Sequence, residues 1–379
     1  MNIGIITFWE TQDNYGQMLQ CYALQRVLES MGHNPFLIRY SLFTDWRFSP
    51  TQMKKIVNPL VVLKHLWWIV KPPRNIMTTT MVDRHFNDFK SKYICSTKHI
   101  WKSHKELQQN PPNADLYICG SDQIWYSFHD VYRYRNILKA FFLDFGNVKK
   151  VAYAASFGRT DFSPAYYKLV KPLIAKLSAV SVRETGGLGV CRQLGHTDAE
   201  VVLDPTCLLA SDDYRRIAVV PCLDEPYMLL YVIGAEKSML DQAIAYSKIY
   251  NLKIYYIGSQ GNDDLSKTYP QLTAIYPTVE EWLGWIAGCR LMVTNSFHGM
   301  AFSILYHRPI VVLTKFGVTR RGGDDRLFTL LEAVGLLERI YQGEFDKLAD
   351  TPMDYAQVDQ LLAKYRSRSM DFLFRSLSE

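Results

Sequence analysis

Polar residues gather in the last third of the chain, where a buried strand is predicted to give way to a helix. The apolar run Leu291–Thr294 predicts the strand, residues 300–306 predict the helix, and the segment between them reads Asn-Ser-Phe-His-Gly. In open α/β sheets ligands bind at the carboxyl ends of the strands, and a helix N-terminus attracts anions through its free N–H groups. Ser296, His298 and Gly299 therefore predict a site for a small anion, with an imidazole that can titrate near neutral pH. A capping or packing role for His298 is the alternative.

Basic side chains surround this segment in the sequence. Residues 309–313 predict the next buried strand, so Lys315 would emerge at the same edge of a parallel sheet. A glycine-containing loop at 320–324 could close over a bound anion, Arg326 follows that loop, and Arg290 precedes the first strand. Several cations and one imidazole at one sheet edge suit a polyanion, although surface solvation is the alternative for Lys315 and Arg326.

Two strand ends in the first third of the chain also carry polar residues. A strand predicted at 3–8 leads into a loop where Asp13 or Asn14 can cap the following helix. Residues 114–119 predict another strand, and it delivers the segment 120–125, which reads Gly-Ser-Asp-Gln-Ile-Trp. Small polar residues followed by a Trp would make a platform for a sugar ring.

Strands and helices alternate along most of the chain, which predicts an α/β fold of parallel sheets flanked by helices. We expect two doubly wound, Rossmann-like domains facing a cleft, and a terminal helix that could cross back to the first domain. A proline-bracketed break at 221–226 separates the two halves. The predicted units are a first domain at 1–220 with a helical insert at 48–110, a second domain at 227–350, and a C-terminal helix at 354–379.

Length, composition and charge agree with this reading. The chain has 379 residues, too many for one ordinary domain, and its 48% hydrophobic content can fill sizeable cores. A net charge of +6 fits an anionic substrate or a membrane surface better than nucleic acid, which would need clustered basic stripes. The seven cysteines are scattered and form no CxxC, and residues 1–7 lack a basic leader. These features predict a reduced, cytoplasmic chain without a signal peptide.

The segment 57–71 is apolar but shorter than the ~20 residues that a membrane span needs. It contains paired Trp67 and Trp68 and is flanked by lysines, so it could lie on a bilayer surface. A core helix or a face of a homo-oligomer is the alternative.

Five motifs, taken in order along the chain, resemble those of the polysaccharide pyruvyl transferase family. They are Asn14-Tyr15-Gly16, Gly120-Ser121-Asp122-Gln123-Ile124-Trp125, Ser181-Val182-Arg183-Glu184, Leu203-Asp204-Pro205-Thr206 and Ser296-Phe297-His298-Gly299. The resemblance covers roughly residues 1–340. It implies a GT-B-like fold and an enzyme that transfers a pyruvyl group from phosphoenolpyruvate onto a sugar of a surface polysaccharide or its precursor. The product would be a pyruvate ketal, released together with phosphate.

The resemblance also implies roles for particular residues. His298 would donate a proton or contact the phosphate. Arg183 would hold the phosphate or carboxylate, unless it forms an ion pair with Glu184 or a neighbour. Asp13 or Asp122 would be the base. The full candidate set for donor binding is Arg183, Ser296, Gly299, Lys315, Arg326 and Arg290, and for acceptor binding Asn14, Tyr15, Ser121 and Trp125. Many relatives carry an Arg at the position of Ser296, so Arg290 or Arg159 would have to replace it.

Ketal formation needs no cofactor or metal, and no His/Cys cluster has metal-binding spacing. We expect a glycan acceptor, which could be lipid-linked, and with it a peripheral membrane contact; we expect no nucleic-acid partner. Two other functions remain open. One is a GT-B nucleotide-sugar glycosyltransferase, with Asp324 or Glu332 at a ribose. The other is a non-catalytic glycan-binding protein of polysaccharide assembly.

Overall fold

The computed structural model describes residues 1–42, 82–126, 131, 134–232, 236–258, 265–315, 317, 319–320 and 322–378. The segment 57–71, with its proposed membrane contact, lies outside these residues, as does Arg321 in the loop predicted to close over an anion.

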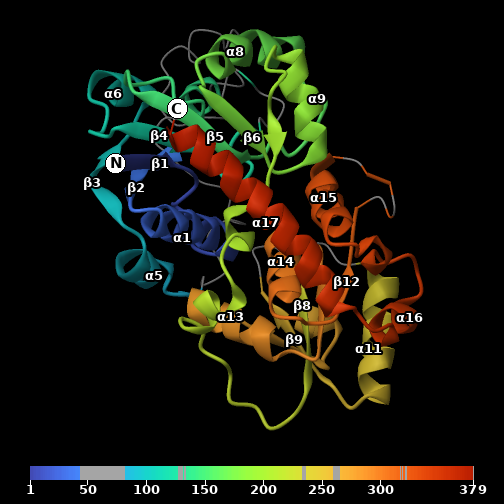
Figure 1. Cartoon of the computed structure of the whole chain (residues 1–379). Helices are drawn as coiled ribbons and strands as arrows, with labels where there is room; N and C mark the ends of the chain where they lie inside the picture. The colour runs from blue at the N-terminus through green and yellow to red at the C-terminus, as the bar shows by residue number, and fades with distance from the viewer. Residues whose placement is uncertain are drawn as a thin grey trace, which may run out of the picture.

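The described residues form two fully parallel sheets (Figure 1). The seven-stranded sheet has the order β3-β2-β1-β4-β5-β6-β7, and the five-stranded sheet has the order β10-β9-β8-β11-β12. The first contains β1 (Asn2–Ile6), β2 (Asn34–Tyr40), β3 (Ser96–Trp101), β4 (Leu116–Cys119), β5 (Lys149–Ala155), β6 (Ala179–Val182) and β7 (Glu200–Val201). The second contains β8 (Tyr227–Tyr231), β9 (Lys253–Ile257), β10 (Leu272–Ile275), β11 (Leu291–Thr294) and β12 (Ile310–Val312).

Helices connect the strands and cover the sheets, as expected for parallel strands joined by crossovers. Those of the first domain are α1 (Tyr15–Ser30), α5 (Phe86–Tyr93), α6 (His104–Gln109), α7 (Arg135–Phe141), α8 (Pro164–Ile174), α9 (Thr185–Gln193), the short 3-10 helix η2 (Pro205–Cys207) and α10 (Ser211–Arg215). Those that follow are α11 (Lys237–Ile249), α12 (Leu265–Thr268), α13 (Val279–Gly288), α14 (Phe297–Leu305), η3 (Gly322–Asp324), α15 (Asp325–Ala333), η4 (Leu337–Arg339), α16 (Phe345–Asp350) and α17 (Tyr355–Ser378).

Both faces of each sheet are buried, which explains the continuous apolar strands in the sequence. Successive side chains of a strand point to opposite faces. In β4, Leu116 and Ile118 pack into one hydrophobic cluster, while Tyr117 and Cys119 pack into another. The second sheet behaves in the same way and has a separate cluster on its outer face.

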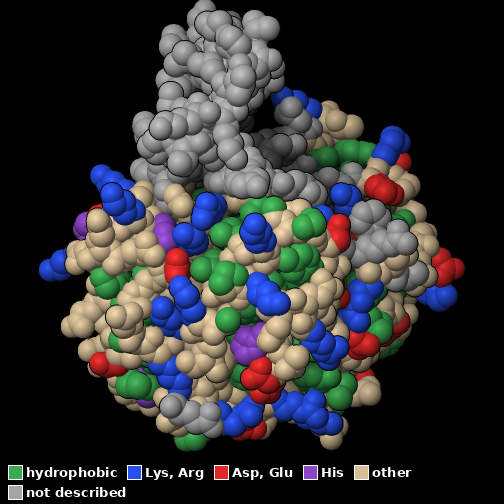
Figure 2. Space-filling model, turned by 90° about the horizontal axis from the view of Figure 1, so that it is seen from above, with side chains coloured by type: hydrophobic (Ala, Val, Ile, Leu, Met, Phe, Trp, Pro, Cys, Tyr) green, Lys and Arg blue, Asp and Glu red, His purple; other side chains and the backbone are tan. Residues whose placement is uncertain are grey.

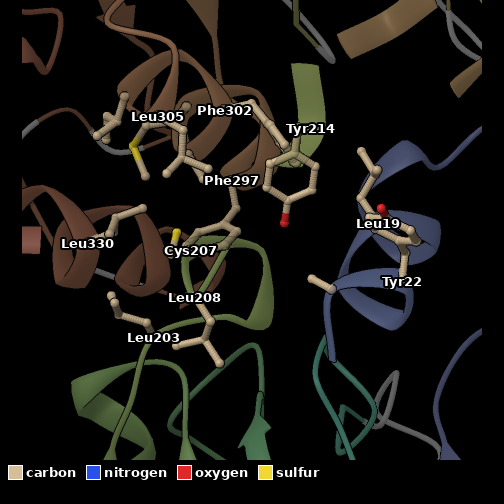
Figure 3. Close-up of a cluster of buried hydrophobic side chains, with 14 of the residues drawn as sticks. Leu19, Tyr22, Leu203, Cys207, Leu208, Tyr214, Phe297, Phe302, Leu305 and Leu330 are labelled. Atoms are coloured by element: carbon tan, nitrogen blue, oxygen red, sulfur yellow. The ribbon is translucent and has the colours of Figure 1, made fainter. Parts of the chain in front are cut away.

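One of these clusters continues across both domains. Figure 3 shows part of it: Leu19 and Tyr22 of α1 and Leu203, Cys207 and Leu208 of the first domain lie near Phe297, Phe302 and Leu330 of the second. The interface between the domains is therefore a shared apolar core as well as a polar contact surface.

Helix α17 returns from the second domain to the first and lies across both (Figure 1). Arg366 donates to the backbone oxygens of Cys207 and Leu209, at 2.9 and 3.2 Å. Ser369 Oγ accepts from the backbone N–H of Leu203 at 2.9 Å. The prediction of two doubly wound domains with a helix crossing back is confirmed. The break at 221–226 falls between the two sheets, but the exact domain boundaries stay a prediction.

Two observations are relevant to the partners of the protein: the distribution of surface charge and the character of its helices. On the face seen in Figure 2, Lys and Arg side chains are dispersed among apolar and uncharged ones. Among the described residues, no helix combines the length and apolar character that crossing a bilayer would require.

Candidate functional site

The carboxyl ends of the two sheets face each other, and chemically active residues follow several of the strands there. In each sheet the connections reverse direction between two neighbouring strands, β1 and β4 in the first and β8 and β11 in the second. Such switch points are where open α/β sheets bind ligands. The segment 120–122 follows β4, and the segment 295–298 follows β11, so both predicted polar clusters lie at switch points.

Asp204, in the turn between β7 and η2, is the centre of a buried polar network. Its Oδ1 accepts from the N–H and the hydroxyl of Thr206, at 3.0 and 2.7 Å. Its Oδ2 accepts from Ser121 Oγ at 2.9 Å and from Arg183 Nη1 at 2.8 Å. Burial alone would raise the pKa of Asp204, but the charges of His298 and Arg183 and these hydrogen bonds hold the pKa well below its usual value. Asp204 therefore stays an anion.

His298, the second residue of α14, reaches this network from the other domain. Its Nε2 lies 3.6 Å from Asp204 Oδ2, an ion-pair distance too long for a hydrogen bond, and that nitrogen is buried without a hydrogen-bond partner. The imidazole also lies directly against the first turn of α1, where a Cβ on Gly16 would be 1.9 Å from its Nδ1. His298 thus sits between the domains, with an orphaned ring nitrogen and a permanent carboxylate beside it.

Arg183, at the carboxyl end of β6, is fixed by carboxylates and by an aromatic ring. Besides Asp204, its guanidinium pairs with Asp122, with Nη2 at 3.4 Å from Oδ1. Its carbon Cζ lies 4.5 Å from the centre of the Phe297 ring. Its Nε is buried and has no hydrogen-bond partner. The predicted alternative, an ion pair with Glu184 or a neighbour, is met by Asp204 and Asp122 and not by Glu184. The Glu184 carboxylate accepts instead from Ser156 and from the backbone of 157–158.

Arg326, the second residue of α15, brings a further guanidinium to this cluster from the second domain. Its charge interacts with those of Arg183, Asp122 and Glu184. Its Nε is buried without a partner, and no hydrogen bond or ion pair joins its guanidinium to a described residue. Burial, and then the like charge of Arg183, lower the pKa of Arg326. A partly buried guanidinium without a direct ion pair is unfavourable, so this position favours a bound anion.

Ser121 and Asp122 are held by the first domain itself. The backbone N–H of Ser121 donates to Gln20 Oε1 at 2.9 Å, and its carbonyl accepts from Thr7 Oγ1 at 3.0 Å. Ser121 is fully buried and holds Asp204, so it positions the network. Its predicted contact with an acceptor is wrong.

The predictions that Trp125 and Tyr15 bind the acceptor are also wrong, because both aromatic side chains pack into the interior. Trp125 is fully buried, stacks on Phe142 with ring centres 4.5 Å apart, and donates from Nε1 to the backbone of Phe141. Tyr15 is fully buried at the domain interface, where its hydroxyl donates to the Pro277 carbonyl at 2.7 Å. Neither ring can receive a sugar.

The helix starts bring the remaining polar candidates to the carboxyl edges, largely as caps. Ser296 is the N-cap of α14, and its Oγ accepts from the N–H of Gly299 at 3.3 Å, so that N–H is already used. Asn14 is the N-cap of α1 and is exposed. Asp13, in the same loop, is partly exposed, and its charge interacts with Tyr231 at the end of β8. These positions keep Asp13 and Asn14 beside the facing edges.

Three basic candidates lie outside the cluster. Arg290 is exposed at the amino end of β11, the edge opposite to His298, so its prediction as a donor ligand is wrong. Arg159 pairs with Asp161 at 2.7 Å. Lys315 is exposed, and its backbone N–H donates to Asp324 at 2.7 Å.

Sequence reasoning assigned no role to Asp204 or Gly16, although both lie within the quoted motifs. Asp204 follows an apolar run and precedes Pro205, which is a signal for a turn and not for an ion-pair centre. A glycine at position 16 indicates that a side chain is excluded there, but the sequence does not reveal which residue occupies the space. A long-range prediction of contacts would have been needed to connect them with His298.

The fold and the facing polar edges define a two-domain, Rossmann-like α/β protein of the GT-B type. A family model described as polysaccharide pyruvyl transferase matches residues 14–314. The chain belongs to that family, and it is therefore a transferase.

Two solved structures are similar to this chain. A UDP-N-acetylglucosamine 2-epimerase from Rickettsia bellii is 8% identical, with 99% of this chain and 96% of that chain covered and a TM-score of 0.50. The UDP-GlcNAc 2-epimerase of Methanocaldococcus jannaschii, solved with UDP-GlcNAc and UDP, is 13% identical, with 100% and 99% covered and a TM-score of 0.48. Among curated proteins, none matches this chain at a significant level.

Proposed function

We propose that the protein transfers the enolpyruvyl-derived group of phosphoenolpyruvate to a sugar diol of a polysaccharide or its precursor, forming a pyruvate ketal and phosphate. The observation that carries the proposal is the unpaired guanidinium of Arg326, whose charge interacts with that of Arg183. Arg183 and His298 both contact Asp204. Phosphoenolpyruvate offers a phosphate and a carboxylate around one reactive carbon. It would supply the negative charge that the Arg326 guanidinium lacks.

The chemistry needs a proton donor at the methylene carbon of phosphoenolpyruvate. His298 would protonate that carbon, which becomes a methyl group and leaves an oxocarbenium-like centre at C2. A sugar hydroxyl attacks C2, the bond from C2 to the phosphate oxygen breaks, and a second hydroxyl of the sugar closes the ketal. Asp204, held as an anion, would orient the imidazole and stabilise its cationic form.

The two candidate bases, Asp122 and Asp13, differ in the strength of the contacts that their carboxylates already make. Asp122 is paired with Arg183, whereas the Asp13 carboxylate accepts from Thr11 in its own loop. We therefore assign the acceptance of the sugar proton to Asp13. Arg183 and Arg326 would hold the phosphate and carboxylate as negative charge moves to the leaving phosphate.

The test is the release of inorganic phosphate from phosphoenolpyruvate across a panel of acceptor glycans. We expect release with at least one acceptor, and a loss of at least ~100-fold in the His298→Ala variant. His307→Ala is the matched control, since His307 is exposed and pairs with Asp359, and it should retain full activity. Binding of uridine diphosphate sugars without turnover of phosphoenolpyruvate would assign the protein to nucleotide-sugar transfer instead.

A further inference from the structure

Helix α9 begins directly after Arg183-Glu184, and its N-terminus is capped by residues of the other domain. Its own N-cap residue, Glu184, makes no side-chain capping hydrogen bond, because its carboxylate faces the loop at 156–158. Instead, the N–H of Gly186 donates to Asp325 Oδ2 at 2.7 Å. The N–H of Thr185 donates to Thr329 Oγ1 at 3.1 Å. The first N–H groups of a helix lack partners within the helix and need such acceptors, and a carboxylate is favoured there by the helix dipole.

The cap residues belong to the first turns of α15, which also carries Arg326. Asp325 is 6% exposed, and its other oxygen pairs with Arg320 Nε at 2.5 Å. Asp325 and Arg326 are adjacent in the chain, so docking of the Asp325 carboxylate on α9 fixes the backbone from which the Arg326 side chain projects. A Cβ on Gly186 would lie 2.6 Å from Asp325 Oδ2, so the close approach depends on a glycine at this position.

We propose that Asp325 is a positioning residue for anion binding. By capping α9 across the domain interface, it holds Arg326 beside Arg183, so the anion site is complete only while this contact is made. The inference rests on the proposed function, since it assigns the anion to the donor substrate. It adds that donor affinity depends on a contact between domains that does not itself touch the donor.

The experiment measures the binding of phosphoenolpyruvate, and separately of inorganic phosphate, by calorimetry on the full-length protein. We expect Asp325→Ala and Arg326→Ala each to weaken binding at least ~10-fold, the scale of a lost charge-assisted contact. The double variant should bind no more weakly than Arg326→Ala alone, because both changes remove the same contact with the anion. Asp325→Asn, which keeps an oxygen for the Gly186 N–H, should bind within ~3-fold of the unaltered protein.

Ser163→Ala is the matched control, because it removes an N-cap acceptor from α8 away from the site. It should lower thermal stability without changing affinity. If Asp325→Ala binds as tightly as Ser163→Ala, or if the double variant loses affinity additively, the positioning role is wrong. If Asp325→Asn is as weak as Asp325→Ala, the ion pair with Arg320 and not the cap is responsible. Binding of phosphate without turnover of phosphoenolpyruvate would reject the proposed reaction and leave the positioning role testable; binding of neither ion would reject the anion site itself.

Discussion

At the residue scale, the site depends on which charges are paired and which are not. The Asp204 carboxylate accepts four hydrogen bonds and makes ion-pair contacts with Arg183 and His298, so it is a fixed structural anion. The Arg326 guanidinium donates no hydrogen bond to a described residue and forms no ion pair with one. Asp204 and Arg326 lie in one cluster. Asp204 supports the structure of the site, whereas Arg326 is available to bind a ligand.

A first prediction concerns Gly16. In Gly16→Ala the new methyl group would collide with the His298 ring, so the imidazole or the domain must shift. Phosphate release should fall about 100-fold, as expected for a catalytic group displaced by about 1 Å. The control is Gly189→Ala in α9, where no atom lies within 4 Å of the added group. That variant should keep full activity and unfold with a free energy about 0.5–1 kcal/mol higher.

A second prediction concerns how the contribution of Asp204 to the unfolding free energy changes with pH. The Asp204→Asn variant should lose about 3 kcal/mol of unfolding free energy at pH 7, because Arg183 keeps a buried charge without its main partner. A carboxylate with a depressed folded pKa stabilises the protein above its unfolded pKa of about 3.9. The difference in unfolding free energy between the unaltered protein and Asp204→Asn should therefore have its full size at pH 5 and become smaller below about pH 4. A difference that persists unchanged to pH 3 in chemical denaturation would show that the charge of Asp204 is not its source.

Part of this site could be predicted from the sequence, because strand ends and helix starts leave a local signature. His298, Asp122 and Arg183 were placed at carboxyl edges for that reason, and the structure brings them into one cluster with Arg326. Trp125 and Tyr15 have the same signature but point into cores. The direction of a side chain after a strand is decided by tertiary packing, and one sequence does not contain that information.

At the element scale, α17 braces the turn that carries Asp204. Its residues Arg366 and Ser369 bond to the backbone of 203, 207 and 209, on both sides of that carboxylate. Phe372 packs near Tyr153 of β5, with ring centres 6.3 Å apart. The last helix is therefore a support for the site as well as a connection between domains.

Ser369→Ala tests this support. The change leaves the buried N–H of Leu203 without an acceptor, and it should lower the unfolding free energy by about 1–3 kcal/mol in chemical denaturation. Ser378→Ala, at an exposed position of the same helix, should change it by less than about 0.5 kcal/mol. Equal effects from the two changes would mean that α17 does not brace the turn.

The elements themselves could be predicted where a strand is buried on both faces or a helix is amphipathic. Strand β3 was missed because it lies at the sheet edge, and only Trp101 at its end is buried. The apolar run at 141–145 also reads as a strand in the sequence, but α7 ends at Phe141 and a turn follows it. Short apolar runs suit a buried helix end as well as a strand, so periodicity alone does not separate them.

At the scale of the whole molecule, the two domains are joined by polar as well as apolar contacts. Arg84 of the first domain donates to the Gly258 carbonyl at 2.6 Å and to the Tyr15 hydroxyl at 3.2 Å. Tyr15 stacks on Trp282 of the second domain, with ring centres 5.1 Å apart. These contacts lie on the α1 side of the site, and the cap of α9 by Asp325 is a separate polar contact between the domains.

Arg84→Ala should weaken this interface. The Gly258 carbonyl loses a donor in a buried position, so the unfolding free energy should fall by about 1–3 kcal/mol. Arg216→Ala removes an arginine from an exposed ion pair with Asp213 and should cost less than about 1 kcal/mol. If both variants unfold at the same denaturant concentration as the unaltered protein, the Arg84 contacts contribute nothing to holding the domains together.

The position of α17 in the chain has a consequence for how the protein is made. Domains emerge from the ribosome in order, and the first one can fold while the second is still being synthesised. The turn at 203–209, however, finds its bracing partners Arg366 and Ser369 more than 150 residues later. A nascent chain should therefore hold a nearly complete first sheet with a loose turn at 203–209, and competence for the proposed reaction should arrive only after α17 has been synthesised.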